Sequence, residues 1–480
     1  MDRSNDQRQY GYSGLQYGDG SQQRVFTYTD EVFPEWGLAD VIQEYGLLNI
    51  RPFLTNYNRA NFLNGDYPMG FIVNEGMLKK MSDALINAPD SIHVWVPYSV
   101  GTFGYDYKGF ERYEAAYLMG ELNWGTLLTI IPGVRWEEEY TVYDGQRYRV
   151  NQSGQTAETP PTEFVKLNVV RRNKYWLPML TLIVKPTDWL QVKTAVTQTL
   201  ARPDYIRYAP ISYISADSKQ VTAANLFLKP SRSTNYDIGF SIYNNEIGLL
   251  AVNAFYKRVE DLIFYSAFFY RPGIEVDPNL ELPSSWLASN PQINAYRNNP
   301  NPAKYYGFEI EWQTHFWYLP SVLSGLVLNV NYTHIYSEMT LAYDSLVTTQ
   351  IGTRRYYSLK KTSIKTRMPD QPSHIFNITI GYDFEGFSAR LSYLYQTDKL
   401  TGIGYDGVVP TSNLSAYTGG YGRLDLTLQQ KLLPNLQLFA NLNNLNNRHD
   451  QNFIGSNLTH PSYIEYYGLT MDLGVRYNLE

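Results

Sequence analysis

The chain has 480 residues, of which 44% are hydrophobic and 15% aromatic, and its formal net charge is −6. This slightly acidic balance gives no reason to expect a nucleic-acid partner. The absence of cysteine excludes disulfides, thiolate metal sites and cysteine nucleophiles. The longest apolar runs, such as 247–252, are far shorter than the roughly 18 to 20 residues of a membrane helix.

The first 106 residues carry one clear helical signal. In the segment 74–87, Met77, Met81 and Leu85 recur at helical spacing. Asn74 can cap the first turn of this helix, and Pro89 can end it. We interpret the helix as a packing element of a long loop region, and a place beside a ligand entrance is the alternative. A strand at 23–29 is a further alternative for this part of the chain.

From about residue 107 to the C-terminus, apolar and polar residues alternate in about thirteen segments. Such segments lie, for example, at 306–313, 376–384, 387–395 and 423–428. The apolar side of the last segment consists of Tyr467, Leu469, Met471, Leu473, Val475, Tyr477 and Leu479. A soluble β-sandwich also alternates, but its strands average about five or six residues. The longer segments here favour strands that cross a membrane.

The connections between these segments are alternately short and long. Short, turn-forming connections lie at 122–125, 185–189, 244–248, 318–325, 385–386 and 432–435. Long ones, of roughly 15 to 40 residues, lie at about 143–174, 202–232, 264–303, 337–371, 397–419 and 446–462. This arrangement is typical of a transmembrane barrel. We therefore predict an all-β protein, an antiparallel transmembrane β-barrel, with strands in 107–480 and an extracellular loop region in 1–106.

Two of the long loops carry aromatic and basic residues that suit a ligand pocket. Aromatic rings supply flat apolar surface, and a guanidinium group can anchor a carboxylate or phosphate. The predicted ligand-binding residues are Arg202, Tyr205, Arg207, Tyr208, Phe268 and Phe269. The alternative is that these aromatic side chains form an outer girdle or pack loop against loop. A basic segment at 353–367 suits either an anionic ligand or an acidic lipid surface.

Catalytic and metal-binding signals are absent from the sequence. None of the six histidines has a partner at the spacing of a metal site, and no nucleophile motif or phosphate-binding loop occurs. We therefore expect no enzyme activity, no metal and no cofactor.

The alternating segments resemble, in the same order, those of TonB-dependent outer-membrane receptors. Segments 110–145 ("FERYEAAYLMGELNWGTLLTIIPGVRWEEEYTVYDG") and 176–205 are similar to two of that family's hairpins. The segments 305–316 ("YYGFEIEWQTHF"), 436–450 ("LQLFANLNNLNNRHD") and 466–480 are similar to later strands. The resemblance implies energised uptake of a scarce large nutrient, such as an iron chelate, a vitamin, an oligosaccharide or a peptide. It also implies a plug domain, a TonB energy-coupling complex, outer-membrane lipid and, in some relatives, a surface lipoprotein as partners in a Gram-negative cell.

Two features depart from that family's pattern. About thirteen strands are predicted where the family has about 22, and no segment reads as a plug or an energy-coupling box. Tyr477 is followed by Asn478, Leu479 and Glu480, whereas the family usually ends in an aromatic residue. The odd strand number and the lack of a signal peptide predict the C-terminal part of a longer receptor, with a free sheet edge near Glu111. A complete, smaller passive porin or adhesin is the alternative.

Overall fold

The computed structural model describes residues 2–5, 10–11, 28–38, 40, 51–56, 72–88, 96–97, 107–148, 164–215, 218–278, 280, 282–287 and 289–479. In the N-terminal part, the predicted helix is confirmed as α3 (Glu75–Ile86), and Asn74 caps it by accepting a hydrogen bond from the backbone N–H of Met77 at 3.1 Å. Two 3-10 turns, η1 (Pro34–Trp36) and η2 (Arg51–Phe53), precede it. Pro89 and residues 23–27 lie outside the described residues. In the described part, no helix is long and apolar enough to cross a membrane.

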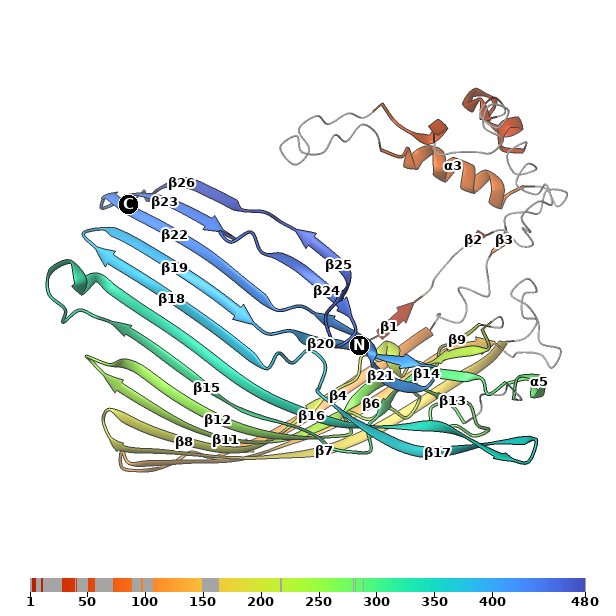
Figure 1. Ribbon diagram of the computed structural model, residues 1–480, viewed down its shortest axis with the longest axis horizontal. Helices are drawn as coiled ribbons and strands as arrows, with labels where there is room; N and C mark the ends of the chain where they lie inside the picture. Colours follow the sequence, from red (N-terminus) through yellow and green to blue (C-terminus); the bar gives the residue numbers. More distant parts are fainter. Residues whose placement is uncertain are drawn as a thin grey trace.

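The main sheet is antiparallel, strongly curved and built almost entirely from sequence neighbours (Figure 1). Thirteen long strands follow one another across it, which confirms the predicted strand number within the described residues. They are β4 (Tyr107–Met119), β6 (Leu128–Tyr148), β7 (Phe164–Thr187), β8 (Leu190–Ala201), β11 (Ser231–Asn244), β12 (Gly248–Glu260), β15 (Ala303–His315), β16 (Leu326–Ile351), β18 (His374–Phe384), β19 (Phe387–Gln396), β22 (Tyr421–Leu433), β23 (Leu436–Asn443) and β26 (Thr470–Tyr477).

The six predicted short turns lie together at one end of this sheet. β5 (Leu122–Trp124) continues β4 into the first turn, and Gly125 there has a φ of 60° that a residue with a side chain rarely adopts. The β15–β16 connection contains η7 (Ser321–Gly325), and the β18–β19 turn consists of Glu385 and Gly386. Short turns at one end match the periplasmic end of a membrane barrel.

The long connections at the other end contain more strands than the sequence suggested. β9 (Ser212–Ser215), β10 (Gln220–Ala223), β13 (Ile263–Phe269) and β14 (Gln292–Asn298) form a four-stranded sheet, with the short helix α5 (Ser284–Leu287) between β13 and β14. A second such sheet comprises β20 (Lys399–Asp406), β21 (Val409–Thr418), β24 (His449–Ile454) and β25 (His460–Tyr466).

The predicted bounds of the loops at 143–174 and 337–371 were wrong, because strands occupy much of both ranges. β6 and β7 continue to Tyr148 and from Phe164, and β16 continues to Ile351 before β17 (Arg354–Thr366) returns beside it as a hairpin (Figure 1). Strands extend here because their backbone groups pair with a neighbour well beyond the length that a membrane requires.

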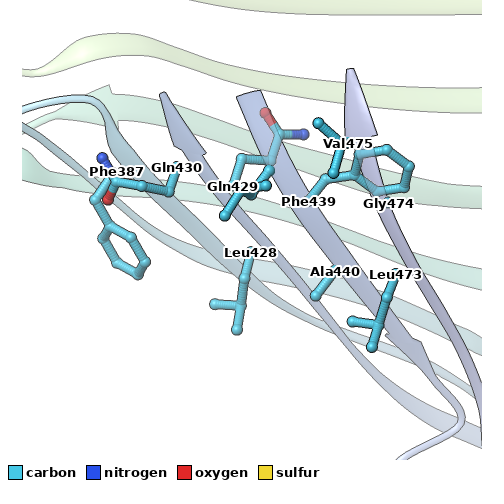
Figure 2. A pocket seen from close by; sticks show the side chains of 10 residues that line it. Phe387, Leu428, Gln429, Gln430, Phe439, Ala440, Leu473, Gly474 and Val475 are labelled. Carbon is cyan, nitrogen blue, oxygen red and sulfur yellow. The ribbon is translucent and has the colours of Figure 1, made fainter. Parts of the chain in front are cut away.

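The two faces of the main sheet differ because side chains alternate along each strand. Four tyrosines on one face form a row across adjacent strands, with ring centroids 6.1, 6.4 and 5.0 Å apart: Tyr236, Tyr256, Tyr306 and Tyr336. Further along, Leu428, Ala440 and Leu473 are register partners on this apolar face, and Figure 2 shows them on the opposite side of the strands from Gln429.

The other face of the main sheet, here the polar face, carries charged residues along the middle of the strands as well. Glu309 and Glu311 of β15 lie on it beside Asn331 of β16. At the long-loop end, Val259, Ala303, Met339 and Leu341 of this face are buried in one cluster with Phe264 of the loop strand β13. Since the loops fold over the polar face, that face is the inner one and the apolar face is the outer one.

The edges of the main sheet are β26 on one side and β4 with β1 (Asp2–Asn5) on the other. β1 pairs with only the first residues of β4, from Tyr107 to Phe110. Beyond them, from Glu111 to Met119, β4 pairs with β6 alone among the described residues, and no pairing there joins β4 to β26. This arrangement agrees with the free edge predicted near Glu111.

Candidate ligand-binding site

A cavity of about 530 Å³ lies on the polar face of β4, β6, β7 and β8. Its walls include the apolar side chains of Tyr117, Leu177 and Met179, and its charged residues are Arg135, Glu137 and Arg202. A mainly apolar concave surface with a few convergent polar groups is the usual form of a small-molecule site. Arg202, which was predicted as a ligand-binding residue from the sequence, thus lines the cavity.

The charged end of this cavity holds two guanidinium groups and one carboxylate. The Arg135 Nε donates to Glu137 Oε1 at 2.6 Å, and Arg202 forms an ion pair with the other oxygen of Glu137. Both arginines keep part of their side chain exposed, whereas Glu137 is nearly buried. The group therefore carries one excess positive charge beside the open space. Guanidinium donors that remain free in this way can bind a carboxylate or phosphate oxygen.

Above the cavity, the loop that begins at Arg202 is fixed to the sheet through Glu111. The Glu111 carboxylate is buried, and one of its oxygens accepts hydrogen bonds from the hydroxyls of Tyr143 at 2.6 Å and Tyr208 at 2.7 Å. The guanidinium of Arg171 lies 4.5 Å from the Tyr208 ring centroid. Burial, and the hydrogen bond to Glu111, raise the pKa of the Tyr208 hydroxyl, so this tyrosine stays neutral.

Tyr208 packs beneath the loop and is not exposed at its surface. Its side chain is only 2% exposed, in a cluster with Tyr107, Tyr143, Ala209, Ile211 and Leu228. Of the two interpretations given to the aromatic loop residues, packing describes this one.

Tyr205 and Arg207 lie nearer the surface. Tyr205 is 36% exposed, and its ring centroid is 6.1 Å from that of Tyr107. Arg207 forms an ion pair with Asp204 at 3.0 Å and lies 4.0 Å from the ring centroid of Tyr296. Because Tyr296 belongs to β14, Arg207 joins the first predicted ligand loop to the second.

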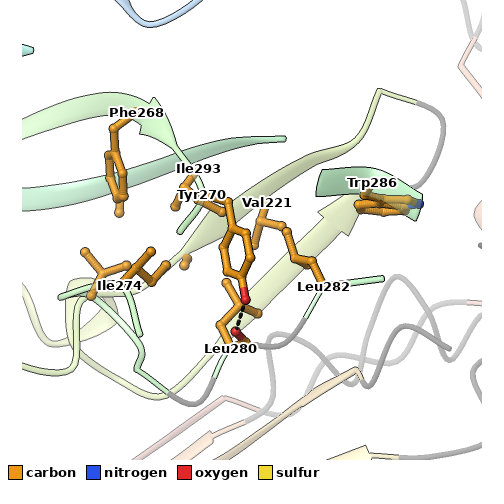
Figure 3. Close-up of a cluster of buried hydrophobic side chains, with 11 residues drawn as sticks. Val221, Phe268, Tyr270, Ile274, Leu280, Leu282, Trp286 and Ile293 are labelled. Carbon is orange, nitrogen blue, oxygen red and sulfur yellow. Dashed lines mark hydrogen bonds between the residues drawn. The ribbon is translucent and has the colours of Figure 1, made fainter. Parts of the chain in front are cut away.

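The second predicted loop contributes one buried and one half-buried phenylalanine. Phe268 is 8% exposed in a cluster with Val221, Ile274, Trp286 and Ile293 (Figure 3). The guanidinium of Arg297 lies 4.7 Å from the Phe268 ring centroid. In the same cluster, the Tyr270 hydroxyl donates to the backbone oxygen of Leu280 at 2.7 Å (Figure 3). Phe269, one residue further along β13, is half-buried.

The structure thus brings the two predicted loops together but separates the predicted residues. β10 of the first loop pairs with β14 of the second, and Asn225 donates to the backbone oxygen of Tyr296 at 3.0 Å. Tyr208 and Phe268 lie in two different buried clusters. Neither Arg135 nor Glu137 was among the residues predicted from the sequence. Their proximity to Leu177 and Arg202 depends on a strand register that the sequence does not state.

A second hollow, of about 510 Å³, lies over Leu428, Ala440 and Leu473 (Figure 2). It opens on the outer, apolar face, so we do not assign a nutrient to it. Among the described residues, no group of three His, Asp or Glu side chains is arranged to hold a metal ion.

Comparison with known proteins identifies the family. The family model described as "TonB dependent receptor-like, beta-barrel" matches residues 1–445, so the chain belongs to the family of TonB-dependent receptor β-barrels. This confirms the resemblance and the predicted all-β membrane-barrel fold. No curated protein sequence matches the chain.

Solved structures with the same fold include two receptors. One is the Serratia marcescens hemophore receptor HasR, in complex with its hemophore HasA and heme, with a TM-score of 0.50 and 17% identity over 78% of this chain and 51% of that one. Another is the ferric-catecholate import receptor Fiu of E. coli K12, with a TM-score of 0.51 and 18% identity over 82% of this chain and 48% of that one. The chain spans about half the length of these receptors.

Proposed function

We propose that the protein is an outer-membrane receptor that takes up a scarce, large nutrient through a plugged β-barrel in a Gram-negative cell. Uptake would be energised by a TonB complex acting on a plug domain, and the 107–480 strands would form the C-terminal part of the barrel. Residues 1–106 would belong to its extracellular loop region. No covalent chemistry is involved.

The observation that carries this proposal is the cavity on the inner face, where Arg135 and Arg202 share the single carboxylate of Glu137. A passive channel does not need an apolar hollow of ligand size with convergent cations, whereas a receptor does. The candidate ligand therefore combines an anionic group with an apolar or aromatic body. Iron chelates, heme-like compounds, vitamins with acidic groups and acidic oligosaccharides or peptides share that chemistry.

Within the site, the predicted residues take two roles. Arg202 would bind the ligand in the cavity, and Tyr205, Arg207 and Phe269 would contact it at the loop surface. Tyr208 and Phe268 would hold the two loops in place from below, because both are buried. A surface lipoprotein that lids the loops remains part of the proposal that comes from the family resemblance.

An uptake assay tests the function. The full-length receptor is expressed in a Gram-negative strain with or without TonB and supplied with a panel of labelled ferric catecholate, heme and cobalamin. We expect saturable uptake of at least one compound that requires TonB. Non-saturable uptake that does not require TonB would support the passive porin instead.

Binding of the compound found in that way tests the site. Arg202→Ala and Arg207→Ala should each weaken binding by about 10- to 100-fold, since a charge-assisted hydrogen bond contributes roughly 1.5 to 3 kcal/mol. Lys219→Ala, in the same loop but bonded to Ser289 at 2.8 Å, is the matched control and should bind as the unmodified receptor does. Unchanged affinity in both arginine variants would move the site to other loops or to the plug.

A further inference from the structure

The tyrosine row on the apolar face has the arrangement expected at the edge of a membrane. The row consists of Tyr236, Tyr256, Tyr306 and Tyr336 on the adjacent strands β11, β12, β15 and β16. Each of the four side chains is at least partly exposed. Aromatic rows of this kind lie at the interface between hydrocarbon and headgroups in membrane barrels. The next outward-facing position toward the long loops therefore lies at the level of the lipid headgroups.

Charged residues fill that next position. Two residues beyond Tyr256, Tyr306 and Tyr336 on the same face are Arg258, Lys304 and Glu338, and these three are register partners across β12, β15 and β16. Because successive side chains on a face are about 6.6 Å apart along a strand, this charged row lies directly next to the tyrosine rings, on the side of the long loops.

Positive charge exceeds negative charge in and around this row. Glu260 accepts from Arg232 at 2.7 Å and lies 3.4 Å from Arg258, and Glu338 accepts from Lys365 at 3.1 Å. The four basic residues, Arg232, Arg258, Lys304 and Lys365, thus face only two carboxylates. This local excess of positive charge contrasts with the formal net charge of the whole chain, which is −6.

The cations of this row are also accessible. The side chains of Arg258 and Lys365 are 49% and 70% exposed. Lys304 is exposed as well and forms no ion pair within the part of the chain that the structure describes. The network therefore has donors available for a further anion.

We propose that this basic row, defined as Arg232, Arg258, Lys304 and Lys365, binds the phosphate groups of a phosphorylated glycolipid in the outer leaflet. The tyrosine rings would contact the glycolipid's sugar and upper acyl chains, while the guanidinium and ammonium groups bind its phosphates. The inference rests on the proposed outer-membrane location but not on nutrient uptake. A similar group, Arg112, Arg172 and Lys174 with Glu114 and Glu138, lies on β4, β6 and β7 beyond the paired Trp136 and Trp176.

The test compares the outer face with the inner face of the sheet at the same level. Full-length receptor in detergent is titrated with fluorescent bisphosphorylated lipid A and with the same lipid after dephosphorylation. The variant Arg258→Gln/Lys304→Gln should bind the bisphosphorylated lipid about 30-fold more weakly, because each basic group near an anionic surface strengthens binding roughly fivefold. The control Lys257→Gln changes the neighbouring residue, whose ammonium lies 5.3 Å from the Tyr305 ring centroid on the inner face, and should bind normally.

Several outcomes would overturn the proposal. One is equal affinity of the double variant and the Lys257→Gln control for lipid A. Another is equal binding of the two lipids by the unmodified receptor, a comparison that needs no variant to fold. Competition by inorganic phosphate at the concentration of the lipid would indicate a free-phosphate site instead. Nutrient uptake is measured separately, so a receptor that binds the lipid but fails the uptake assay contradicts only the proposed function.

Discussion

The aromatic ring of Phe439 on β23 covers Gly474 on β26. The two residues are direct partners in the antiparallel ladder, and a Cβ at Gly474 would lie 2.3 Å from the ring. A side chain cannot occupy that space unless the ring moves. On the inner face, the last strand thus packs against its neighbour by placing a glycine beneath a phenylalanine ring.

Replacing this glycine should destabilise the sheet. Gly474→Val forces the Phe439 ring aside, and overpacking of this kind costs about 1 to 3 kcal/mol in the free energy of unfolding. Unfolding from lipid vesicles by denaturant measures the loss. Gly120→Ala is the control, because a Cβ there meets nothing within 4 Å. If the double variant Phe439→Ala/Gly474→Val is no more stable than Gly474→Val alone, the ring is not the cause.

A charge on the apolar face should be costly, and a charge on the polar face should not. Leu426 is a register partner of Leu391 and Leu442 within the apolar face. Leu426→Arg should lower the free energy of unfolding in vesicles by about 2 to 4 kcal/mol if the residue lies near the bilayer midplane. Thr427→Arg, one residue further on the inner face, should change stability by much less. Equal losses in the two variants would contradict the assigned faces.

The two hydroxyls on Glu111 should act together. Tyr143→Phe and Tyr208→Phe each remove one hydrogen bond from a buried carboxylate, at an expected cost of about 1 to 3 kcal/mol. Because both hydroxyls donate to the same oxygen, the double variant should differ from the sum of the single changes by at least about 0.5 kcal/mol. Thermal unfolding of all four proteins gives this coupling, and strict additivity would show that the hydroxyls do not share the carboxylate.

Alkaline pH should loosen the contact of the loop hairpin β20–β21 with the rest of the protein. The Tyr405 hydroxyl donates to the backbone oxygen of Tyr265 at 2.8 Å, and burial raises the pKa of Tyr405 to about 12. The raised pKa means that this contact stabilises the fold fully below pH 10 and that the contribution is lost as pH rises from 10 toward 12. Protease sensitivity of the hairpin should therefore increase in that range.

Tyr405→Phe is the comparison for this pH effect. The variant cannot ionise and cannot donate, so its hairpin should be more sensitive at neutral pH and should change less between pH 10 and 12. A pH profile identical to that of the unmodified protein would show that Tyr405 is not the titrating group.

The strands and turns of the sheet were predictable because a membrane strand must alternate and a tight turn needs Gly, Pro, Asn or Asp. The hairpin β16–β17 was missed, since residues beyond the membrane need no regular apolar side and 337–371 was assigned to an irregular loop. In that hairpin, apolar side chains such as Met339 and Leu341 are buried against the protein interior and do not face lipid.

The candidate site was predictable only in part. Arg202 was identified from its loop, but aromatic residue types serve buried clusters and ligand surfaces equally, so the burial of Tyr208 and Phe268 did not follow from the sequence. The Arg202–Glu137 pair joins residues far apart in the chain. This ion pair depends on the register of β6, β7 and β8, and that register is set by the pairing of the strands along their whole length.

The assignment of the two faces underlies both the inner cavity and the basic row, and one labelling experiment tests it directly. Since the chain has no cysteine, single cysteines can replace Phe308, Glu309, Ile310, Glu311 and Trp312 in turn and carry a fluorescent label. In vesicles of brominated lipid, we predict strong quenching at positions 308, 310 and 312 and weak quenching at 309 and 311, with aqueous iodide giving the reverse. Uniform quenching along β15, or the opposite alternation, would contradict a membrane barrel with this inner face.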